Sequence, residues 1–298
     1  MDNIRQIFRV SLYNFKKWHR NPRIITVFLM NFMLCLFFSE KILSFVTKYD
    51  TILQISESFN WIFGDAKSVM IFSLLLIFLF SDMPFVTKAT PYVLNRCSKR
   101  NWMLGQVLYV CLATVFLVLA TFLFTCIITS KYAFIGNQWS ETAAMIVYSG
   151  VGEKIAIPAS LSAMEGALPY QCAVHIFFLL LGYTLVLATL LMRLNLQKQS
   201  FLGGIGVLLI NGYGLLLKPD IFMELFQIPQ VMSYKANVMI GWASLLNHAT
   251  YHMHNFGFNY LPRLWMSYLI FLILIIVNIR SSLKKIKAYE FDFVQEEE

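Results

Sequence analysis

The sequence predicts an all-α integral membrane protein. It has six transmembrane helices, an N-terminal amphipathic helix on the membrane surface, a basic cytoplasmic helix between spans two and three, and short dipping helices between spans five and six. Of the 298 residues, 58% are hydrophobic and only 13% are charged, as is typical of membrane proteins. A bilayer core about 30 Å thick needs roughly 20 apolar residues of helix, and six blocks approach that length. No spacer is long enough for a soluble domain, so residues 1–298 form one membrane domain.

The domain divides into a surface helix (1–23), a six-span core (24–281) and a cytoplasmic tail (282–298). The first apolar block is too long for a signal peptide and lacks a small-residue cleavage pattern, so we expect it to be retained. The predicted spans are Ile24–Val46, Ala66–Phe85, Trp102–Thr129, Cys172–Met192, Phe201–Leu217 and Leu261–Ile279.

Residues 2–20 have the periodicity of an amphipathic helix, with apolar and basic side chains on different sides. Such a helix lies in the headgroup layer with its basic side toward anionic lipid or a partner. The alternative is a soluble helix docked on a partner protein. A break at Asn21-Pro22-Arg23 then starts the first span. The apolar side chains are Ile4, Ile7, Phe8, Leu12, Phe15 and Trp18, and the basic ones are Arg5, Arg9, Lys16 and Arg20.

The placement of Lys and Arg predicts the orientation. Segments 1–23, 81–101, 193–200 and 280–298 hold two thirds of the 24 basic residues. Both termini are therefore expected in the cytoplasm of a multi-pass plasma-membrane protein, with three longer loops outside. The net charge of +8 reflects this topology, and we expect no nucleic-acid partner.

The polar insert 81–102 lies between two long apolar blocks. Thr90 is a good N-cap and Pro91 a good first helical residue, which predicts a helix running from Pro91 toward the third span. The bland alternative is that the insert only fixes topology. On such a helix one stripe comprises Tyr92, Arg96, Lys99 and Met103, and another comprises Val93, Leu94 and Cys97.

Charge is nearly absent from the spans. No span carries the acid, His or Arg ladder of an ion-coupled transporter, which favours an external energy source. The fifth span is thinned by glycines, which indicates packing within the chain, a dimer seam or a flexing point. The charged residues at span ends are Glu40, Lys41, Asp65, Lys67, Asp82 and Arg193, and they either reach the interface or line a translocation path. The glycines are Gly203, Gly204, Gly206, Gly212 and Gly214.

The last outer loop, 218–262, is too apolar for a plain connector and too interrupted to span. We expect short helices at 221–228 and 236–246 that dip into the outer leaflet and pack against the spans. The loop also holds His248, His252 and His254, of which the first two have the spacing of helical metal pairs. Since no Cys or carboxylate lies near them, we expect a hydrogen-bonding interfacial patch rather than a metal site, and we assign no chemistry to the five cysteines.

Over nearly the full length of the chain, this layout resembles the transmembrane subunit of type-2 ABC transporter permeases. The resemblance rests on the basic N-terminal helix ending in Asn-Pro-Arg, the six spans, the helix between spans two and three, and the dipping segments. It implies that residues 91–101 form a coupling helix whose Tyr92, Arg96, Lys99 and Arg100 contact an ATPase subunit. The implied partners are two ABC ATPase subunits and a second copy or a related permease.

No Walker A sequence is present, since Gly150-Val-Gly-Glu-Lys-Ile155 lacks both the spacing and the Ser or Thr. The chain is therefore expected to be no enzyme and to bind no cofactor, with ATP and Mg²⁺ held by the partner. The aromatic, nearly uncharged spans favour an amphipathic or hydrophobic cargo, such as a peptide, a lipid-linked molecule or a toxic compound. The resemblance implies export. The alternatives are an integral membrane enzyme or a non-transporting immunity or sensor protein.

Overall fold

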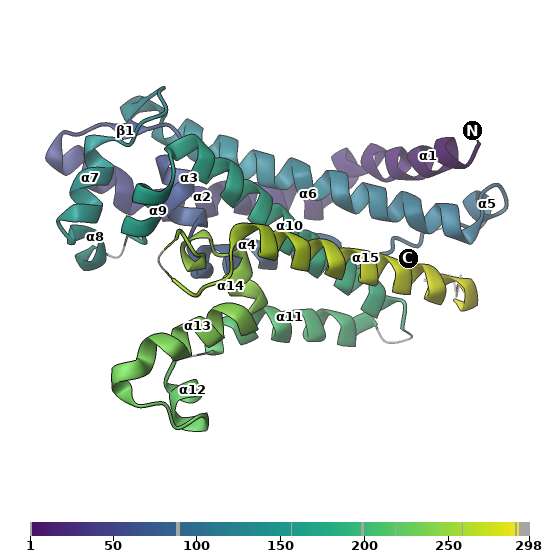
Figure 1. The fold of residues 1–298 in the computed structure, drawn as a ribbon. Coiled ribbons are helices and arrows are strands. Elements are labelled where there is room, and N and C mark those ends of the chain that lie inside the picture. Colours follow the sequence, from purple (N-terminus) through teal and green to yellow (C-terminus); the bar gives the residue numbers. More distant parts are fainter. Residues whose placement is uncertain are drawn as a thin grey trace.

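Six apolar helices lie side by side in the computed structural model, which describes residues 2–87, 90–155, 157–197, 200–217, 219–257, 259–289 and 291 (Figure 1). They are α2 (Pro22–Tyr49), α4 (Ala66–Phe80), α6 (Lys99–Thr129), α10 (Pro169–Asn195), α11 (Ser200–Leu216) and α15 (Leu264–Ala288). Among the described helices, α2, α6, α10 and α15 are each long and apolar enough to cross a bilayer. The count of candidate spans rises from four to six if each of two bent helix pairs forms one span.

The chain turns into α2 at the Asn21-Pro22-Arg23 break that the sequence predicts. α1 (Asp2–Lys16) is followed by the 3-10 turn η1 (Trp18–Arg20), and α2 begins at Pro22. The Asn21 side chain accepts a hydrogen bond from the backbone N–H of Arg23 at 3.0 Å, which satisfies one free donor of the first turn. The break predicted at Asn21-Pro22-Arg23 is therefore confirmed.

Two apolar segments bend sharply. α3 (Glu57–Phe63) meets α4 at 86°, and the Asp65 side chain caps the first turn of α4. The predicted second span is too long, because α4 ends at Phe80 and not at Phe85. Pro84 follows soon after, and proline both lacks a donor and disfavours helix at the residue before it.

The chain between α11 and α15 forms short helices, as predicted. Helices α12 and α13 pack on each other and project away from the bundle beyond one end of α11, at the lower left of Figure 1. α12 bends from the end of α11 by 82°. That these helices enter the bilayer stays a prediction. The elements are α12 (Pro219–Leu225), η3 (Gln230–Met232), α13 (Ser233–Ala243), α14 (Leu245–Ala249) and η4 (Tyr251–Met253).

The bundle interior is held together by hydrogen bonds as well as by packing. α10 packs against α4, α6, α11 and α15. The Asn211 side chain of α11 accepts hydrogen bonds from Ser73 of α4 at 2.9 Å and from Tyr183 of α10 at 2.6 Å. Asn31 of α2 donates to Thr121 of α6 at 3.0 Å. Such bonds contribute to helix association in lipid, where apolar contact alone gives little preference for a protein neighbour.

Short elements cover one end of the bundle, which we call the loop end. Strand β1 (Leu53–Gln54) pairs in parallel with β2 (Ala133–Phe134), and the buried carboxylate of Glu57 accepts hydrogen bonds from the backbone N–H and the hydroxyl of Ser140 at 2.7 and 2.6 Å. These contacts join α3 to the start of α7. The other short elements here are η2 (Ser130–Tyr132), α7 (Glu141–Tyr148), α8 (Val151–Lys154) and α9 (Leu161–Gly166).

The last span is longer than predicted. α15 continues to Ala288 instead of ending at Ile279, so the first part of the predicted tail 282–298 is helical. Residues 290 and 292–298 of that tail lie outside the described residues. The alternation of polar and apolar positions after Ile279 carries the helix beyond its apolar stretch, because Lys and Arg are good helix formers.

Candidate functional site

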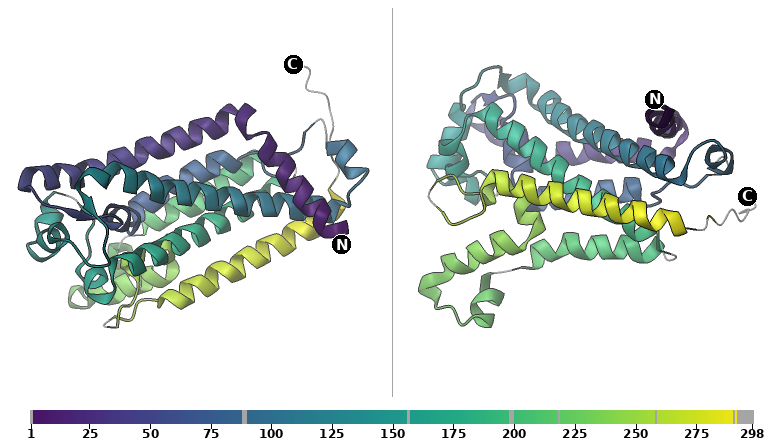
Figure 2. Two further views of the ribbon diagram at one scale, coloured as in Figure 1. Left: turned by 90° about the horizontal axis from the view of Figure 1, so that it is seen from above. Right: turned by 45° about the vertical axis from the view of Figure 1, so that its right-hand side comes forward.

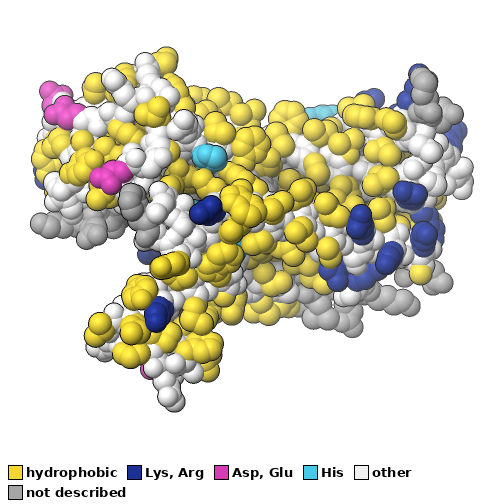
Figure 3. Space-filling view, in the orientation of Figure 1, with side chains coloured by type: hydrophobic (Ala, Val, Ile, Leu, Met, Phe, Trp, Pro, Cys, Tyr) yellow, Lys and Arg dark blue, Asp and Glu magenta, His cyan; other side chains and the backbone are white. Residues whose placement is uncertain are grey.

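The end of the bundle that carries α1, α5 (Thr90–Leu94) and the C-terminal turn of α15 is here called the basic end (Figure 1). On the face shown in Figure 3, most Lys and Arg side chains gather at this end, and Asp and Glu side chains appear toward the loop end. The four basic segments of the sequence thus come together at one end of the helix bundle. Such a charge separation is what the positive-inside rule associates with the cytoplasmic side.

The insert does not form the continuous helix that was predicted. α5 ends at Leu94, the chain turns, and α6 starts anew at Lys99, because the Ser98 hydroxyl accepts a hydrogen bond from the backbone N–H of Asn101 at 3.2 Å and caps the new helix. The predicted stripe is therefore divided, and its fourth member, Met103, is fully buried.

The four predicted contact residues of the insert are nevertheless all exposed. Tyr92 is 74% exposed on α5, Arg96 lies in the turn, and Lys99 and Arg100 lie in the first turn of α6. Lys99 has partners inside the chain, since its Nζ donates to the backbone oxygen of Tyr289 at 2.9 Å. Tyr92, Arg96 and Arg100 thus remain the side chains most available to a partner.

The turn between α5 and α6 is braced from two sides. Gln6 of α1 donates from its side chain to the backbone oxygen of Arg96 at 3.3 Å. The ring of Phe291 lies 5.6 Å from the Lys99 ammonium and 5.4 Å from the Trp102 ring. The insert is consequently connected to both terminal segments of the chain.

α1 packs directly on α6, a contact that the sequence reading missed. Asn14 donates to the side-chain oxygen of Gln106 at 2.9 Å, and the indole N–H of Trp18 donates to Tyr109 at 2.9 Å. Asn101 donates to the side chains of Asn3 and Gln6 at 2.9 and 2.8 Å. The available signal was a third, uncharged polar stripe on α1, formed by Asn3, Gln6 and Asn14.

The packing of α1 leaves part of its apolar side uncovered. Ile4, Phe8 and Leu12 are 64%, 53% and 57% exposed, whereas Phe15 and Trp18 pack against the ring of Tyr109. The predicted basic residues Arg5, Arg9, Lys16 and Arg20 are exposed, and no ion pair involves them within the described ranges.

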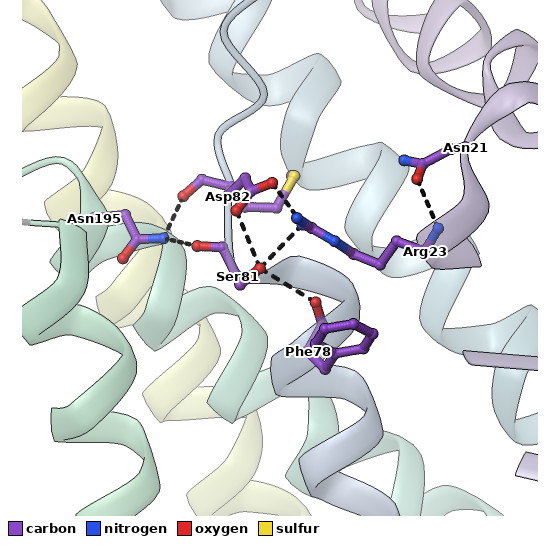
Figure 4. A network of polar contacts seen from close by, with 7 residues as sticks. Asn21, Arg23, Phe78, Ser81, Asp82 and Asn195 are labelled. Carbon is purple, nitrogen blue, oxygen red and sulfur yellow. Dashed lines mark hydrogen bonds and ion pairs between the residues drawn. The ribbon is translucent and has the colours of Figure 1, made fainter. Parts of the chain in front are cut away.

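An ion pair lies at the root of the insert (Figure 4). Arg23 Nη1 at the start of α2 lies 2.5 Å from a carboxylate oxygen of Asp82 and donates to the Ser81 hydroxyl at 3.0 Å. The Asn195 amide at the end of α10 donates to the backbone oxygens of Ser81 and Met83, each at 2.8 Å. Two helices of the bundle, α2 and α10, therefore hold the segment from which the insert departs. Sequence reading placed Asp82 at a span end but did not pair it.

A small recess opens beside the insert. Its volume is about 200 Å³, and it lies between α1, the insert and α6. Arg9 and Tyr13 of α1, Val93 of α5 and Trp102 of α6 are among its lining residues. A partner side chain could enter it next to the exposed basic residues.

The three histidines of the last loop lie at the loop end, and two of them face the same serine. Rings of His248 and His254 lie 2.9 and 2.8 Å from the hydroxyl of Ser267, while His252 lies over Gly64 and beside Trp61. No group of three His, Cys, Asp or Glu side chains with metal-binding geometry occurs within the described part of the chain. Burial lowers the pKa of His254 to about 4, so this ring is neutral near pH 7.

Comparison with protein-family models, with curated proteins and with solved structures finds no match to this chain.

Proposed function

We propose that this chain is the membrane-embedded subunit of an ATP-driven exporter whose ATPase is a separate chain that docks on the basic end. The chain has helices long and apolar enough to span a membrane and no Walker A sequence, so a coupled partner would supply the energy. The cargo proposed is amphipathic or hydrophobic, because the candidate spans are aromatic-rich and nearly uncharged. Two ATPase subunits and a second membrane subunit would complete the transporter in the plasma membrane, with both termini in the cytoplasm.

The observation that carries the proposal is the way the insert is held. Tyr92, Arg96 and Arg100 are exposed, yet the segment 92–100 that carries them contacts α1 through Gln6 and the end of α15 through Tyr289. Its root is tied to α2 and α10 through the network of Figure 4. A force applied by a partner at this turn would reach most of the bundle, as coupling needs packed elements that move together.

The insert is connected at both ends to helices of the bundle, so one short segment would be enough to transmit a movement of the partner. α4 precedes it and α6 follows it, so a shift of the insert acts on two neighbouring helices at once. Exposed Arg side chains favour a partner with carboxylates, since guanidinium and carboxylate groups form paired hydrogen bonds. The recess beside Val93 and Trp102 would accept an apolar side chain of the same partner.

The decisive test is charge reversal at Arg96 and Arg100. The double variant Arg96→Glu/Arg100→Glu should lose co-purification with the ATPase and lose cargo-stimulated ATP hydrolysis, while membrane insertion and thermal stability stay unchanged. Loss of about tenfold or more in apparent affinity corresponds to about 1.4 kcal/mol, within the range of one or two charge-assisted contacts.

The matched control reverses two exposed charges at the loop end, in Lys41→Glu/Lys48→Glu. This variant changes net charge by the same amount and should retain full coupling. Equal ATPase binding and transport in the Arg96→Glu/Arg100→Glu variant and the wild type would refute the proposed docking site.

A further inference from the structure

A groove runs along the outside of the bundle between α10 and α15, which lie side by side (Figures 1 and 2). Its volume is about 510 Å³, within the range of about 300–1,000 Å³ typical of small-molecule sites. Gly182 lines the groove. A Cβ at this position would come within 2.8 Å of the Phe271 ring, so the absence of a side chain lets α10 and α15 approach closely. Its walls are apolar and include Phe178, Leu185 and Leu272.

One polar pair interrupts this apolar lining, near the loop end. Nδ1 of His175 lies 2.9 Å from the hydroxyl of Tyr268, and that hydroxyl also reaches the His175 backbone oxygen at 3.4 Å. The other ring nitrogen, Nε2, makes no hydrogen bond to any described residue. This holds for either tautomer, because Nδ1 is occupied by Tyr268 whether it donates or accepts.

The position of His175 along α10 places its free Nε2 near the boundary of the hydrocarbon core, where a polar atom needs a partner. α10 has 27 residues and is about 40 Å long, about 10 Å more than a hydrocarbon core. His175 is the seventh residue of α10, about 9 Å from its first residue along the axis. With the excess length shared between both ends, the imidazole lies just inside the hydrocarbon boundary. An unsatisfied polar atom at this depth costs free energy, and a lipid carries its ester and hydroxyl oxygens at the same level.

We infer that this groove binds one hydrocarbon chain of a membrane lipid, whose polar end is hydrogen-bonded to Nε2 of His175: an ester oxygen accepts when Nε2 carries the proton, and a lipid hydroxyl donates when it does not. The chain would lie along Phe178, Leu185 and Leu272 toward the basic end. The face over α10 and α15 is mainly hydrophobic (Figure 3), but the free nitrogen distinguishes the groove from the rest of it. The inference depends on the helices crossing a bilayer and does not require the proposed transport activity.

The test uses the full chain reconstituted with a phospholipid that carries a diazirine near the glycerol end of one acyl chain. After irradiation, labelled peptides are located by mass spectrometry. Labelling should concentrate on residues 174–185 and 268–275, about tenfold above the equally exposed surface of α2 around Leu29, if the site is favoured by about 1.4 kcal/mol.

Two variants separate the groove from its polar anchor. Leu272→Trp places a large ring in the groove and should reduce the labelling of residues 174–185 to the level of α2. His175→Phe keeps a ring of similar size but removes Nε2, and should reduce it about fivefold, as expected for loss of one hydrogen bond of about 1 kcal/mol. Leu29→Trp, at a side chain 64% exposed on α2, is the control and should change nothing in the groove.

Three results would overturn the inference. Equal labelling of the groove and α2 would show that no site exists there. Unchanged labelling in Leu272→Trp would show that the chain does not occupy the groove. Labelling that falls in Leu272→Trp but not in His175→Phe would refute the bond to Nε2.

Discussion

The backbone contact of His254 defines which of its ring nitrogens carries the proton. Its Nδ1 lies 2.9 Å from the backbone oxygen of Thr250, and a carbonyl oxygen only accepts, so Nδ1 carries the proton. Nε2 lies 2.8 Å from the Ser267 hydroxyl, whose single proton is shared between this nitrogen and Nδ1 of His248 at 2.9 Å. His248 and His175 lie close enough that a positive charge on either ring would disfavour protonation of His254. Burial dominates, and the pKa of His254 is lowered to about 4 from an ordinary value near 6.5.

This shift predicts an acid-labile loop end. Between about pH 6.5 and 4 the unfolded chain binds a proton at His254 and the folded chain does not, so stability is complete above pH 6.5 and falls as the pH drops toward 4. The loss is on the order of 3 kcal/mol. Thermal unfolding of the purified protein should therefore shift to lower temperature over this window. His254→Gln should remove the part of the pH dependence that His254 contributes and leave the part from His252, whose pKa burial also lowers to about 4. His19→Gln, at an exposed site of η1, should leave the pH dependence unchanged. An identical slope in wild type and His254→Gln would contradict the assignment.

At the scale of single elements, α1 shows how far a sequence pattern reaches. The amphipathic periodicity predicted the helix, and the structure contains α1 over Asp2–Lys16. The pattern could not say which face meets protein, because exposed apolar residues such as Phe8 look the same whether lipid or protein covers them. The face that meets α6 carries Asn3 and Asn14, whose partners Asn101 and Gln106 are about 90 positions away. Long-range polar pairing of this kind has no local signature.

The close approach of α1 and α6 depends on one glycine. A Cβ on Gly105 would lie 2.6 Å from Cβ of Val10, so Gly105→Ala should push the helices apart and cost about 1–3 kcal/mol. A cysteine pair placed across α1 and α6 should then cross-link more slowly, and the melting temperature should fall. Gly204→Ala is the matched control, because a Cβ there meets nothing within 4 Å among the described atoms.

Relief of the clash provides a second check. Combining Gly105→Ala with Val10→Gly removes the Cβ that would be struck, which an alanine at position 10 would keep, and should restore most of the cross-linking rate. A melting temperature for Gly105→Ala equal to that of Gly204→Ala would show that the α1 and α6 contact is loose.

For the whole molecule, hydropathy predicted where the apolar helices lie, and composition predicted the all-α class. Hydropathy did not predict the 86° bend between α3 and α4 or the exact end of α4. Asp65 and Pro84 determine these features through backbone geometry, and a single residue changes the average hydropathy of the surrounding segment very little. The insert was predicted as a polar segment with a helical start. Its break at Ser98 was missed, since a serine that caps a helix and a serine inside one differ only in local hydrogen bonding.

The position of α11 at the edge of the bundle, with α12 and α13 projecting beyond it (Figure 2), bears on assembly. Along α11 the glycines divide into two sets. A Cβ on Gly203 or Gly214 would strike Asn195 or Leu246, whereas a Cβ on Gly212, like that on Gly204, would meet nothing within 4 Å among the described atoms. The first set explains packing within the chain. The second set is open, as required for close approach of another helix in the membrane.

For the arrangement in which the second membrane subunit is another copy of this chain, we predict that Gly212→Trp weakens dimerisation. The indole would extend from the open side of α11, where an added Cβ meets no described atom within 4 Å and where a partner helix must approach closely. Mass measurement of the protein in lipid nanodiscs should show dimers for the wild type and a shift toward monomers for Gly212→Trp, with an unchanged melting temperature. Leu29→Trp, on the exposed side of α2, should remain dimeric because it adds the same ring at a distance from α11. Dimers that persist equally in both variants would place the seam elsewhere, and a monomeric wild type would refute the two-copy arrangement.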